Sequence, residues 1–214
     1  MLRLIILNYK RPENVKKIVF SLWKYFPRIT VINNNPSYKL PYWGGDIDVI
    51  NNEKNYFCME RWIRSYEYPE EYKLILDDDI LPSPFLVKNM IKSKLSFTGI
   101  YGKRGVTTSN NYHELEDVWS TGEVDFIVGS CIFVKQSILN EIQFDLEKIG
   151  YPERGDDIIV SYLIKHKLQV PLKLTSGRFL SLPEGNVGLN KDDKHFIKRW
   201  NVIQKFQNIG WTDS

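Results

Sequence analysis

The sequence predicts a single α/β domain in which helices flank a mixed, mostly parallel sheet. Three observations lead to this prediction. Short apolar runs recur through the first eighty residues, an amphipathic helical pattern separates the first two runs, and 214 residues with 43% hydrophobic composition suit one well-buried core. A strand, a helix and a second strand at this spacing form a βαβ unit, which makes the two strands parallel.

The first βαβ unit lies at the N-terminus. Residues 2–8 (LRLIILN) and 29–33 (ITVIN) are predicted strands, because both runs are apolar and end at turn residues. Pro12 suits the first turn of the helix between them. The apolar face of this helix is predicted to comprise Val15, Ile18, Val19, Leu22, Trp23 and Phe26.

The next elements complete the first half of the sheet. Further strands are predicted at 46–50 (DIDVI) and 73–77 (KLILD), with a helix over 56–67 between them. Another helix begins at Ser83 and Pro84, where serine can cap the helix and proline can occupy its first position.

The second half has a different pattern. Residues 124–135 (VDFIVGSCIFVK) read as a long strand with a break at Gly129, and residues 155–167 read as a helix that opens with two acids. The glycine-rich stretch 175–195 predicts a mobile loop that acts as a lid over the site. A C-terminal helix is predicted over about 192–208.

Composition and charge limit the functional classes. The net charge of +3 comes from Lys and Arg residues spread along the chain, which predicts no nucleic-acid partner. The two cysteines, Cys58 and Cys131, have neither a disulfide-framework nor a zinc-site spacing, so we expect reduced thiols. The apolar run at the N-terminus is too short for a membrane span or a signal peptide. We therefore expect a cytoplasmic protein, and the sequence leaves its oligomeric state open.

Three consecutive carboxylates, Asp77 to Asp79, end the strand predicted at 73–77. Adjacent like charges repel one another and are costly to desolvate, so they need a cation or an exposed position. Side chains alternate along an extended segment, which puts Asp77 and Asp79 on one side as a D-x-D pair. Mg²⁺ and Mn²⁺ in phosphate chemistry are usually held by one or two carboxylates and phosphate oxygens. A metal–diphosphate site and an exposed acidic turn both remain open at this point.

Five stretches together resemble nucleotide-sugar-dependent glycosyltransferases of the GT-A fold. In chain order they are IILNYKRPENV, VINNN, ILDDDILPSP, VGSCIFVK and RGDDIIVSYLI. The chain is most similar to the exostosin-like transferases and to small enzymes of large algal viruses, which would act in a host cytoplasm. The resemblance implies one Rossmann-like GT-A domain over 1–214, with a nucleotide-binding half at about 1–80 and a donor-sugar and acceptor half at about 81–214. The abrupt end of the sequence also fits one domain of a larger protein.

The resemblance implies a nucleotide-binding set at the carboxyl ends of the first strands. This set comprises Leu7, Asn8, Tyr9, Arg11, Asn33, Asn34, Asn55, Arg61, Asp77 and Asp78. Independently of the family, a tyrosine face can stack on a base, asparagine presents a donor and an acceptor, and arginine gives a permanent forked charge for phosphate. The alternatives are a core or surface aromatic for Tyr9 and turn chemistry for the asparagines before Pro36.

The resemblance also implies the groups around the reacting sugar. Asp156 and Asp157 match the acidic pair of the family, with Asp157 as the favoured catalytic carboxylate and Asp156 bonded to a sugar or acceptor hydroxyl. An acidic helix N-terminus is the alternative. Gly129 and Ser130 resemble the segment that passes under the donor sugar, and a β-bulge is the alternative. The implied metal ligands are Asp79, Asp77 and His195.

The predicted function is metal-dependent transfer of a sugar from a UDP-sugar to a hydroxyl of a glycan acceptor, with Mn²⁺ or Mg²⁺ as cofactor. Such a transfer builds positive charge at the anomeric carbon and negative charge on the leaving diphosphate. Trp119 is a candidate for stacking on an acceptor sugar. Two rival functions are a nucleotide-sugar-binding module that has lost transfer and a metal-dependent phosphoryl-transfer enzyme, although the chain has no P-loop or HExxH motif. The transferred sugar, the acceptor and the anomeric outcome stay open.

Overall fold

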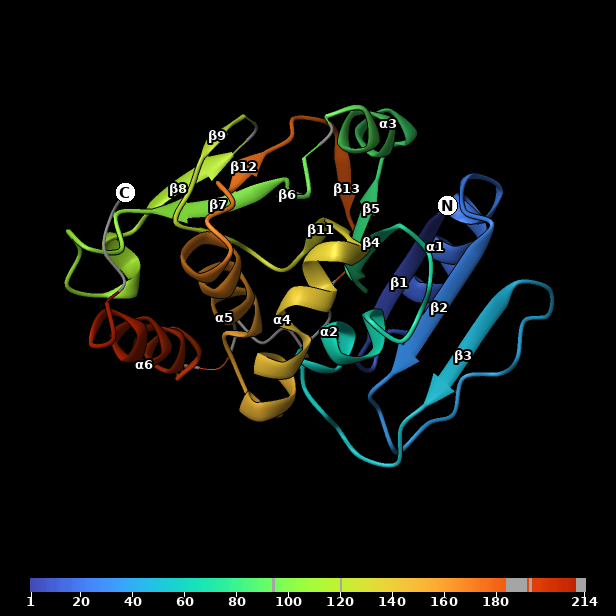
Figure 1. The fold of residues 1–214 in the computed structure, drawn as a ribbon. Helices are drawn as coiled ribbons and strands as arrows, with labels where there is room; N and C mark the ends of the chain where they lie inside the picture. The colour runs from blue at the N-terminus through green and yellow to red at the C-terminus, as the bar shows by residue number, and fades with distance from the viewer. Residues whose placement is uncertain (94, 120, 184–191, 193, 211–214) are drawn as a thin grey trace.

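The protein is an α/β domain with one large central sheet. The structure, a computed structural model, describes residues 1–93, 95–119, 121–183, 192 and 194–210. Within these residues the sheet has eight strands in the order β3-β2-β1-β4-β11-β6-β12-β9 (Figure 1). In that order the strands are Ile47–Asn51, Arg28–Asn33, Leu2–Asn8, Tyr72–Asp77, Cys131–Lys135, Phe97–Gly99, Lys173–Leu174 and Gly122–Glu123.

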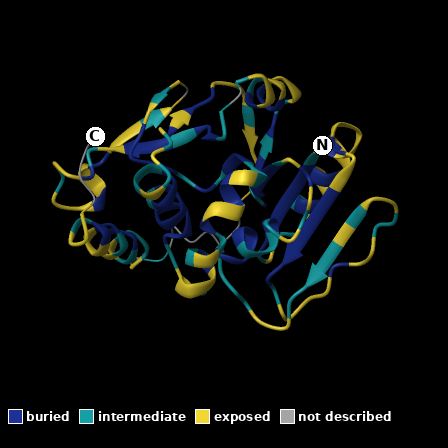
Figure 2. Cartoon of the chain, in the orientation of Figure 1, coloured by how far each residue is buried: buried dark blue, intermediate teal, exposed yellow. Residues whose placement is uncertain are grey.

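Strand direction confirms the predicted mixed, mostly parallel sheet. Strands β3, β2, β1 and β4 run parallel to one another, as the βαβ spacing requires. Strand β11 is antiparallel to both of its neighbours, β4 and β6. The inner strands β1 and β2 are buried along most of their length, whereas β3 at the edge is more exposed (Figure 2).

Two small sheets extend from the large one. One joins β10 (Phe126–Ile127), β7 (Tyr101–Arg104) and β8 (Glu116–Trp119), and the other pairs β5 (Ile80–Pro82) with β13 (Phe179–Ser181). Strand β5 directly follows the three acidic residues at the end of β4. The acidic turn therefore connects the large sheet to the two-stranded sheet of β5 and β13.

Helices cover both faces of the large sheet. They are α1 (Pro12–Leu22), α2 (Glu60–Ser65), α3 (Pro84–Lys92), α4 (Gln136–Ile149), α5 (Asp156–Tyr162) and α6 (His195–Gln207). Alternate residues of β1 face opposite ways: Leu4 and Ile6 join the core with α1 and α3, while Ile5 and Leu7 join the core with the other helices. The result is a three-layer arrangement (Figure 1).

Most predicted elements of the first half agree with the structure. All four strands start within one residue of the prediction. The Oγ of Ser83 accepts a hydrogen bond from the backbone N–H of Leu86, as expected for a helix cap. The helix predicted over 56–67 is shorter, Glu60–Ser65. Trp23, which is predicted on the apolar face of α1, is 62% exposed. Its backbone is still helical, and its position lies at the margin of the face that Val15, Val19 and Leu22 bury.

The second half differs more from its prediction. The long strand over 124–135 is two strands, β10 and β11, and the helix over 155–167 changes to a π-helical turn at Leu163–Lys167. The predicted loop 175–195 contains strand β13, and residues 184–191 and 193 of it lie outside the described residues. The C-terminal helix begins at His195.

Two smaller predictions concern the cysteines and the membrane. Cys58 is half-buried, Cys131 is buried and both are free thiols, as expected. Among the described residues, none of the helices combines the length and the apolar composition that a bilayer crossing needs.

Candidate active site

The carboxyl ends of the central strands open onto a pocket of about 650 Å³. Strand β1 lies between β2 and β4, so the strand order reverses there, and ligands of open α/β sheets bind outside such a switch point. The pocket has a volume typical of small-molecule sites. Its lining comes from both halves of the chain, from the end of β1 at Leu7 to helix α6 at Arg199.

The three acids at the end of β4 lie in different surroundings. Asp78 is buried, accepts a hydrogen bond from the backbone N–H of Tyr9 at 2.7 Å and pairs with Arg11. The side chains of Asp77 and Asp79 are 33% and 27% exposed and line the pocket. Only the first and third acids therefore offer a carboxylate in reach of solvent, which agrees with the alternation expected of a D-x-D pair.

The crowding of acids shifts their protonation. Burial, together with the charges of Asp79 and Asp156, raises the pKa of Asp77 to about 7 against the attraction of Arg61. Burial likewise raises the pKa of Asp78 to about 6, although the charge of Arg11 opposes this shift. An additional positive charge beside Asp77 would favour its charged form.

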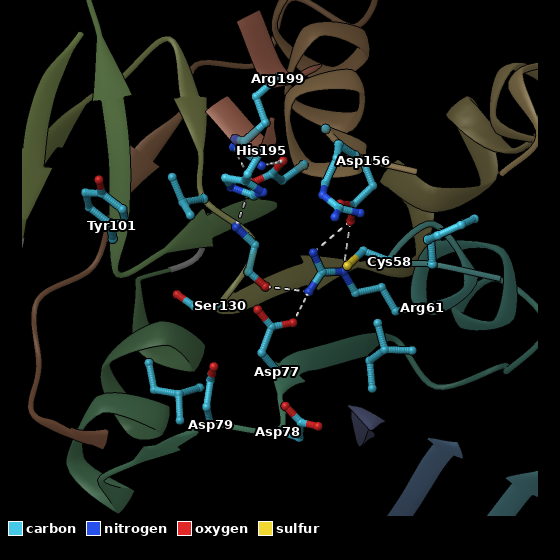
Figure 3. Close-up of a pocket in the computed structure, with 18 of the residues that line it drawn as sticks. Cys58, Arg61, Asp77, Asp78, Asp79, Tyr101, Ser130, Asp156, His195 and Arg199 are labelled. Atoms are coloured by element: carbon cyan, nitrogen blue, oxygen red, sulfur yellow. Dashed lines mark hydrogen bonds and ion pairs between the residues drawn. The ribbon is translucent and has the colours of Figure 1, made fainter. Parts of the chain in front are cut away.

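Arg61 joins the acidic turn to helix α5. Its guanidinium is buried and donates to Asp77 Oδ1 at 2.5 Å, to the carbonyl oxygen of Gly129 at 2.6 Å and to Asp156 Oδ2 at 2.7 and 2.9 Å (Figure 3). Trp62 Nε1 donates to the same Asp156 oxygen at 2.7 Å. Asp156 Oδ1 accepts no hydrogen bond from the described residues. One oxygen of Asp156 is thus fixed by three N–H groups, and the side chain, which is 4% exposed, lines the pocket.

Gly129 is small because Arg61 packs against it. A Cβ atom at this position would lie 2.1 Å from Arg61 Nη2, which is far inside van der Waals contact. The backbone N–H of Gly129 also donates to Asp157 Oδ2 at 3.0 Å. Its neighbour Ser130 lines the pocket and accepts from the backbone N–H of Asp77 at 3.0 Å through its carbonyl oxygen. The predicted small residues therefore support the carboxylates directly.

Asp157 is held by more donors than Asp156. Arg199 of α6 pairs with it in a bidentate manner, with both N···O distances 2.9 Å, and backbone N–H groups of Gly129 and Ile158 each donate at 3.0 Å. Four donors match the acceptor capacity of a carboxylate. The charge of Arg199 and these hydrogen bonds outweigh burial and lower the pKa of Asp157. Arg199 Nε also donates to Tyr112 Oη at 2.9 Å.

Asn8 and Asn33 form a side-chain ladder across the strand ends. Parallel register puts Asn8 beside Asn33 and Asn33 beside Asn51. Asn8 Nδ2 donates to Asn33 Oδ1 at 2.7 Å, and Asn33 Nδ2 donates to Asn51 Oδ1 at 2.9 Å. Neither Asn8 nor Asn33 is among the described residues that line the pocket. Their amides join the carboxyl ends of β1, β2 and β3.

The remaining residues of the implied nucleotide set line the pocket: Leu7, Tyr9, Arg11, Asn34, Asn55 and Arg61. Asn34 Nδ2 donates to the carbonyl oxygen of Phe57 at 2.8 Å, and Asn55 Oδ1 accepts from the N–H of Phe57 at 2.8 Å. Phe57 has φ 57°, and Lys10 beside Tyr9 has φ 66°. Such left-handed non-glycine residues concentrate at functional sites. Lys10 follows the end of β1, and Phe57 lines the pocket.

His195 begins helix α6 on the opposite side of the pocket. Burial and the charge of Arg199 lower its pKa to about 4, so its imidazole is neutral at pH 7. Among the described residues, no three His, Cys, Asp or Glu side chains form a group that could hold a metal ion by themselves. The expected trio of Asp77, Asp79 and His195 is therefore not assembled. Of these three residues, the carboxylates of Asp77 and Asp79 remain as candidate ligands. Proteins usually hold Mg²⁺ beside phosphates with one or two carboxylates.

Sequence reasoning missed the wall that faces the strand ends. This wall comes from β7, β8, β13, α6 and the 3₁₀ turn Tyr112–Glu114. It includes Tyr101, Lys103, Tyr112, His113, Asp117, Phe179, Phe196 and Arg199. These residues lie in elements without a recognisable motif. The alternating pattern of "YGKR" was the sequence signal that could have indicated a strand with Tyr101 and Lys103 on one face and Gly102 on the other.

Comparisons with known proteins support the fold. No family model matches the sequence, and no curated protein matches it. The structure is similar to the inositol-1-phosphate CTP transferase from T. maritima, with 10% identity and a TM-score of 0.53 over 99% of this chain and 98% of that one. It is also similar to HddC from Yersinia pseudotuberculosis, with 13% identity and a TM-score of 0.51 over 96% and 100% of the two chains. At these identities the similarity shows a Rossmann-like fold, and the resemblance to glycosyltransferases stays a prediction.

Proposed function

We propose that the protein is a metal-dependent glycosyltransferase that moves a sugar from a UDP-sugar to a hydroxyl group of a glycan. The observation that supports this most strongly is the connection through Arg61, which joins the D-x-D carboxylate Asp77 to Asp156 across one pocket at the switch point of the sheet. The transfer needs a cationic centre for the diphosphate and a carboxylate near the anomeric carbon, and this connection keeps the two at a fixed separation.

In this proposal Asp79 and Asp77 hold Mn²⁺ or Mg²⁺ together with the donor diphosphate. The cation would neutralise the charge that develops on the departing UDP. Arg11 supplies a further positive charge beside Asp79, at 3.2 Å. Leu7, Tyr9, Asn34 and Asn55 surround the nucleoside, since all four line the pocket next to the ends of β1 and β2.

We assign the reactive carboxylate to Asp156 in preference to Asp157. All four acceptor positions of Asp157 are filled and its pKa is lowered, so it is a poor proton acceptor. Asp156 keeps Oδ1 for a ligand. When the acceptor oxygen bonds to the anomeric carbon and the bond to the diphosphate breaks, Asp156 either receives the hydroxyl proton or stabilises the positive charge on the sugar.

A second candidate is nucleotidyl transfer, which the name of one similar structure favours. That structure is an inositol-1-phosphate CTP transferase, and it covers nearly the full length of this chain. In such a reaction a sugar or polyol phosphate would attack a nucleoside triphosphate and release pyrophosphate. Both reactions could use the same pocket and the same cation. The two functions are therefore distinguished by the products that each reaction releases.

The test is a panel of UDP-, GDP- and CMP-sugars with Mn²⁺, Mg²⁺ or EDTA, assayed for release of the nucleoside diphosphate or monophosphate. We expect metal-dependent turnover of a UDP-sugar that is lost in Asp79→Ala and kept in Asp46→Ala, which removes an exposed acid from the amino end of the sheet. A parallel assay with nucleoside triphosphates and sugar 1-phosphates measures pyrophosphate. Pyrophosphate release without turnover of any nucleotide sugar would reject the glycosyltransferase in favour of the second candidate.

A further inference from the structure

Three aromatic rings form an apolar shelf inside the pocket. One of them, Trp119, is the sequence candidate for stacking on an acceptor sugar, and the roles assigned under the proposed function use none of the three. The shelf consists of Tyr101, Trp119 and Phe179. The centroids of Tyr101 and Trp119 are 4.0 Å apart with planes inclined by 14°, and those of Trp119 and Phe179 are 6.2 Å apart at 18°. Trp119 is 53% exposed. A large apolar surface that is left open inside a pocket indicates a binding site for an apolar face of a ligand.

The shelf is fixed relative to the carboxylates by backbone hydrogen bonds at both of its ends. At one end, the N–H of Val128, next to Gly129, donates to the carbonyl oxygen of Tyr101 at 2.9 Å. At the other end, Phe179 lies in β13, which pairs with β5 directly after the acidic turn. The N–H of Leu182 also donates to the carbonyl oxygen of Asp79 at 2.7 Å. A ligand on the shelf would therefore lie beside the reacting groups.

A polar rim accompanies the rings. Asp117 Oδ1 accepts from Lys103 Nζ at 2.6 Å and from the hydroxyl of Tyr101. Asp117 Oδ2 accepts no hydrogen bond from the described residues, and this side chain is 55% exposed. The rim thus offers a carboxylate acceptor whose charge is balanced by one lysine. This combination suits neutral hydroxyl donors and gives an anion no net attraction.

We propose that the shelf is the acceptor subsite and that it binds a neutral sugar ring. A pyranose has an apolar face of C–H groups, which packs on the rings, and hydroxyl groups at its edge, which donate to Asp117. The nucleotide belongs at the opposite wall, at the ends of β1 and β4. This inference rests on the proposed glycosyltransferase function, and it names the acceptor as an uncharged sugar, as opposed to a uronic acid or a phosphorylated compound.

The first experiment measures steady-state kinetics with a neutral glycoside acceptor. Trp119→Ala should raise the acceptor KM by about tenfold or more, because an exposed tryptophan in a pocket contributes strongly to binding. The Kd of the UDP-sugar should stay unchanged. Trp23→Ala is the matched control, since Trp23 is also exposed but lies where α1 ends, away from the pocket lining. An unchanged acceptor KM in both Trp119→Ala and Phe179→Ala would overturn the assignment of the shelf as the acceptor subsite.

The second experiment needs no donor and no turnover. Saturation-transfer NMR is recorded with methyl glucoside, methyl galactoside, methyl mannoside and methyl glucuronoside. We expect signals for at least one neutral glycoside that disappear in Trp119→Ala and persist in Trp23→Ala, with Asp117→Asn weakening them. No binding of any neutral glycoside, or a preference for the glucuronoside, would overturn the inference. Glycoside binding without turnover of any nucleotide sugar would instead reject the proposed function and keep the shelf as a carbohydrate site.

Discussion

Gly129 should be irreplaceable, because Arg61 occupies the volume that any side chain would need. Its backbone does not have a positive φ, so the left-handed conformation is not the reason for glycine here. An alanine Cβ would lie 2.1 Å from Arg61 Nη2. The backbone cannot retreat easily, since the N–H donates to Asp157 and the carbonyl oxygen accepts from Arg61. The guanidinium must therefore move in Gly129→Ala.

The cost follows from what Arg61 neutralises. Displacement would leave the buried carboxylate of Asp156 without its charge partner, and breaking a buried ion pair costs about 3–5 kcal/mol. For a chain of this length each 1 kcal/mol lowers the melting temperature by about 2–4 °C. We therefore expect Gly129→Ala to melt about 10 °C lower and to lose donor turnover. Gly45→Ala is the control, because its Cβ meets nothing within 4 Å and only its φ of +61° is strained, at about 1–2 kcal/mol.

A double-mutant comparison tests the cause. Gly129→Ala is measured in the wild type and in a background that carries both Arg61→Ala and Asp156→Asn. The second substitution removes the buried charge that Arg61→Ala alone would leave unpaired. If the clash with Arg61 is the reason, the glycine substitution should cost little in that background, as measured by urea unfolding. An equal cost in both backgrounds would refute the reasoning and would indicate a requirement of the backbone itself.

Two further predictions concern stability. Arg199→Met should cost about 3–5 kcal/mol at pH 7, because it leaves Asp157 buried and unpaired, whereas Arg28→Ala should change stability by less than about 1 kcal/mol, since its pair with Asp46 is exposed. In the wild type the lowered pKa of Asp157 gives stability that is fully present above its ordinary pKa of 3.8 and is lost as the pH falls through the native pKa. In Arg199→Met the unpaired carboxyl should have a raised pKa, so the deficit relative to wild type should shrink between pH 7 and pH 5 in urea unfolding; a deficit independent of pH would contradict this. Ser83→Ala should lose about 1 kcal/mol with the α3 cap, and an unchanged melting temperature would show that the cap is dispensable.

The sequence by itself determined the four parallel strands of the sheet and one side of the site. Apolar runs located β1 to β4, of which β1, β2 and β4 are largely buried on both faces and β3 is half-buried at the edge. The acids at 77–79 marked the carboxyl end where a pocket forms. The Asp156–Asp157 pair was also visible as an acidic start of a helix. These features are local, so neighbouring residues were sufficient to predict them.

Only the tertiary structure decided how those residues are used. Asn33 and Asn34 are adjacent in sequence, but strand register directs Asn33 into a ladder with Asn8 and leaves Asn34 at the pocket. The two acids of α5 differ because Arg61, 95 residues earlier, binds one and Arg199, 42 residues later, binds the other. Which donors fill a carboxylate depends on packing between distant segments, and that information is not contained in local sequence patterns.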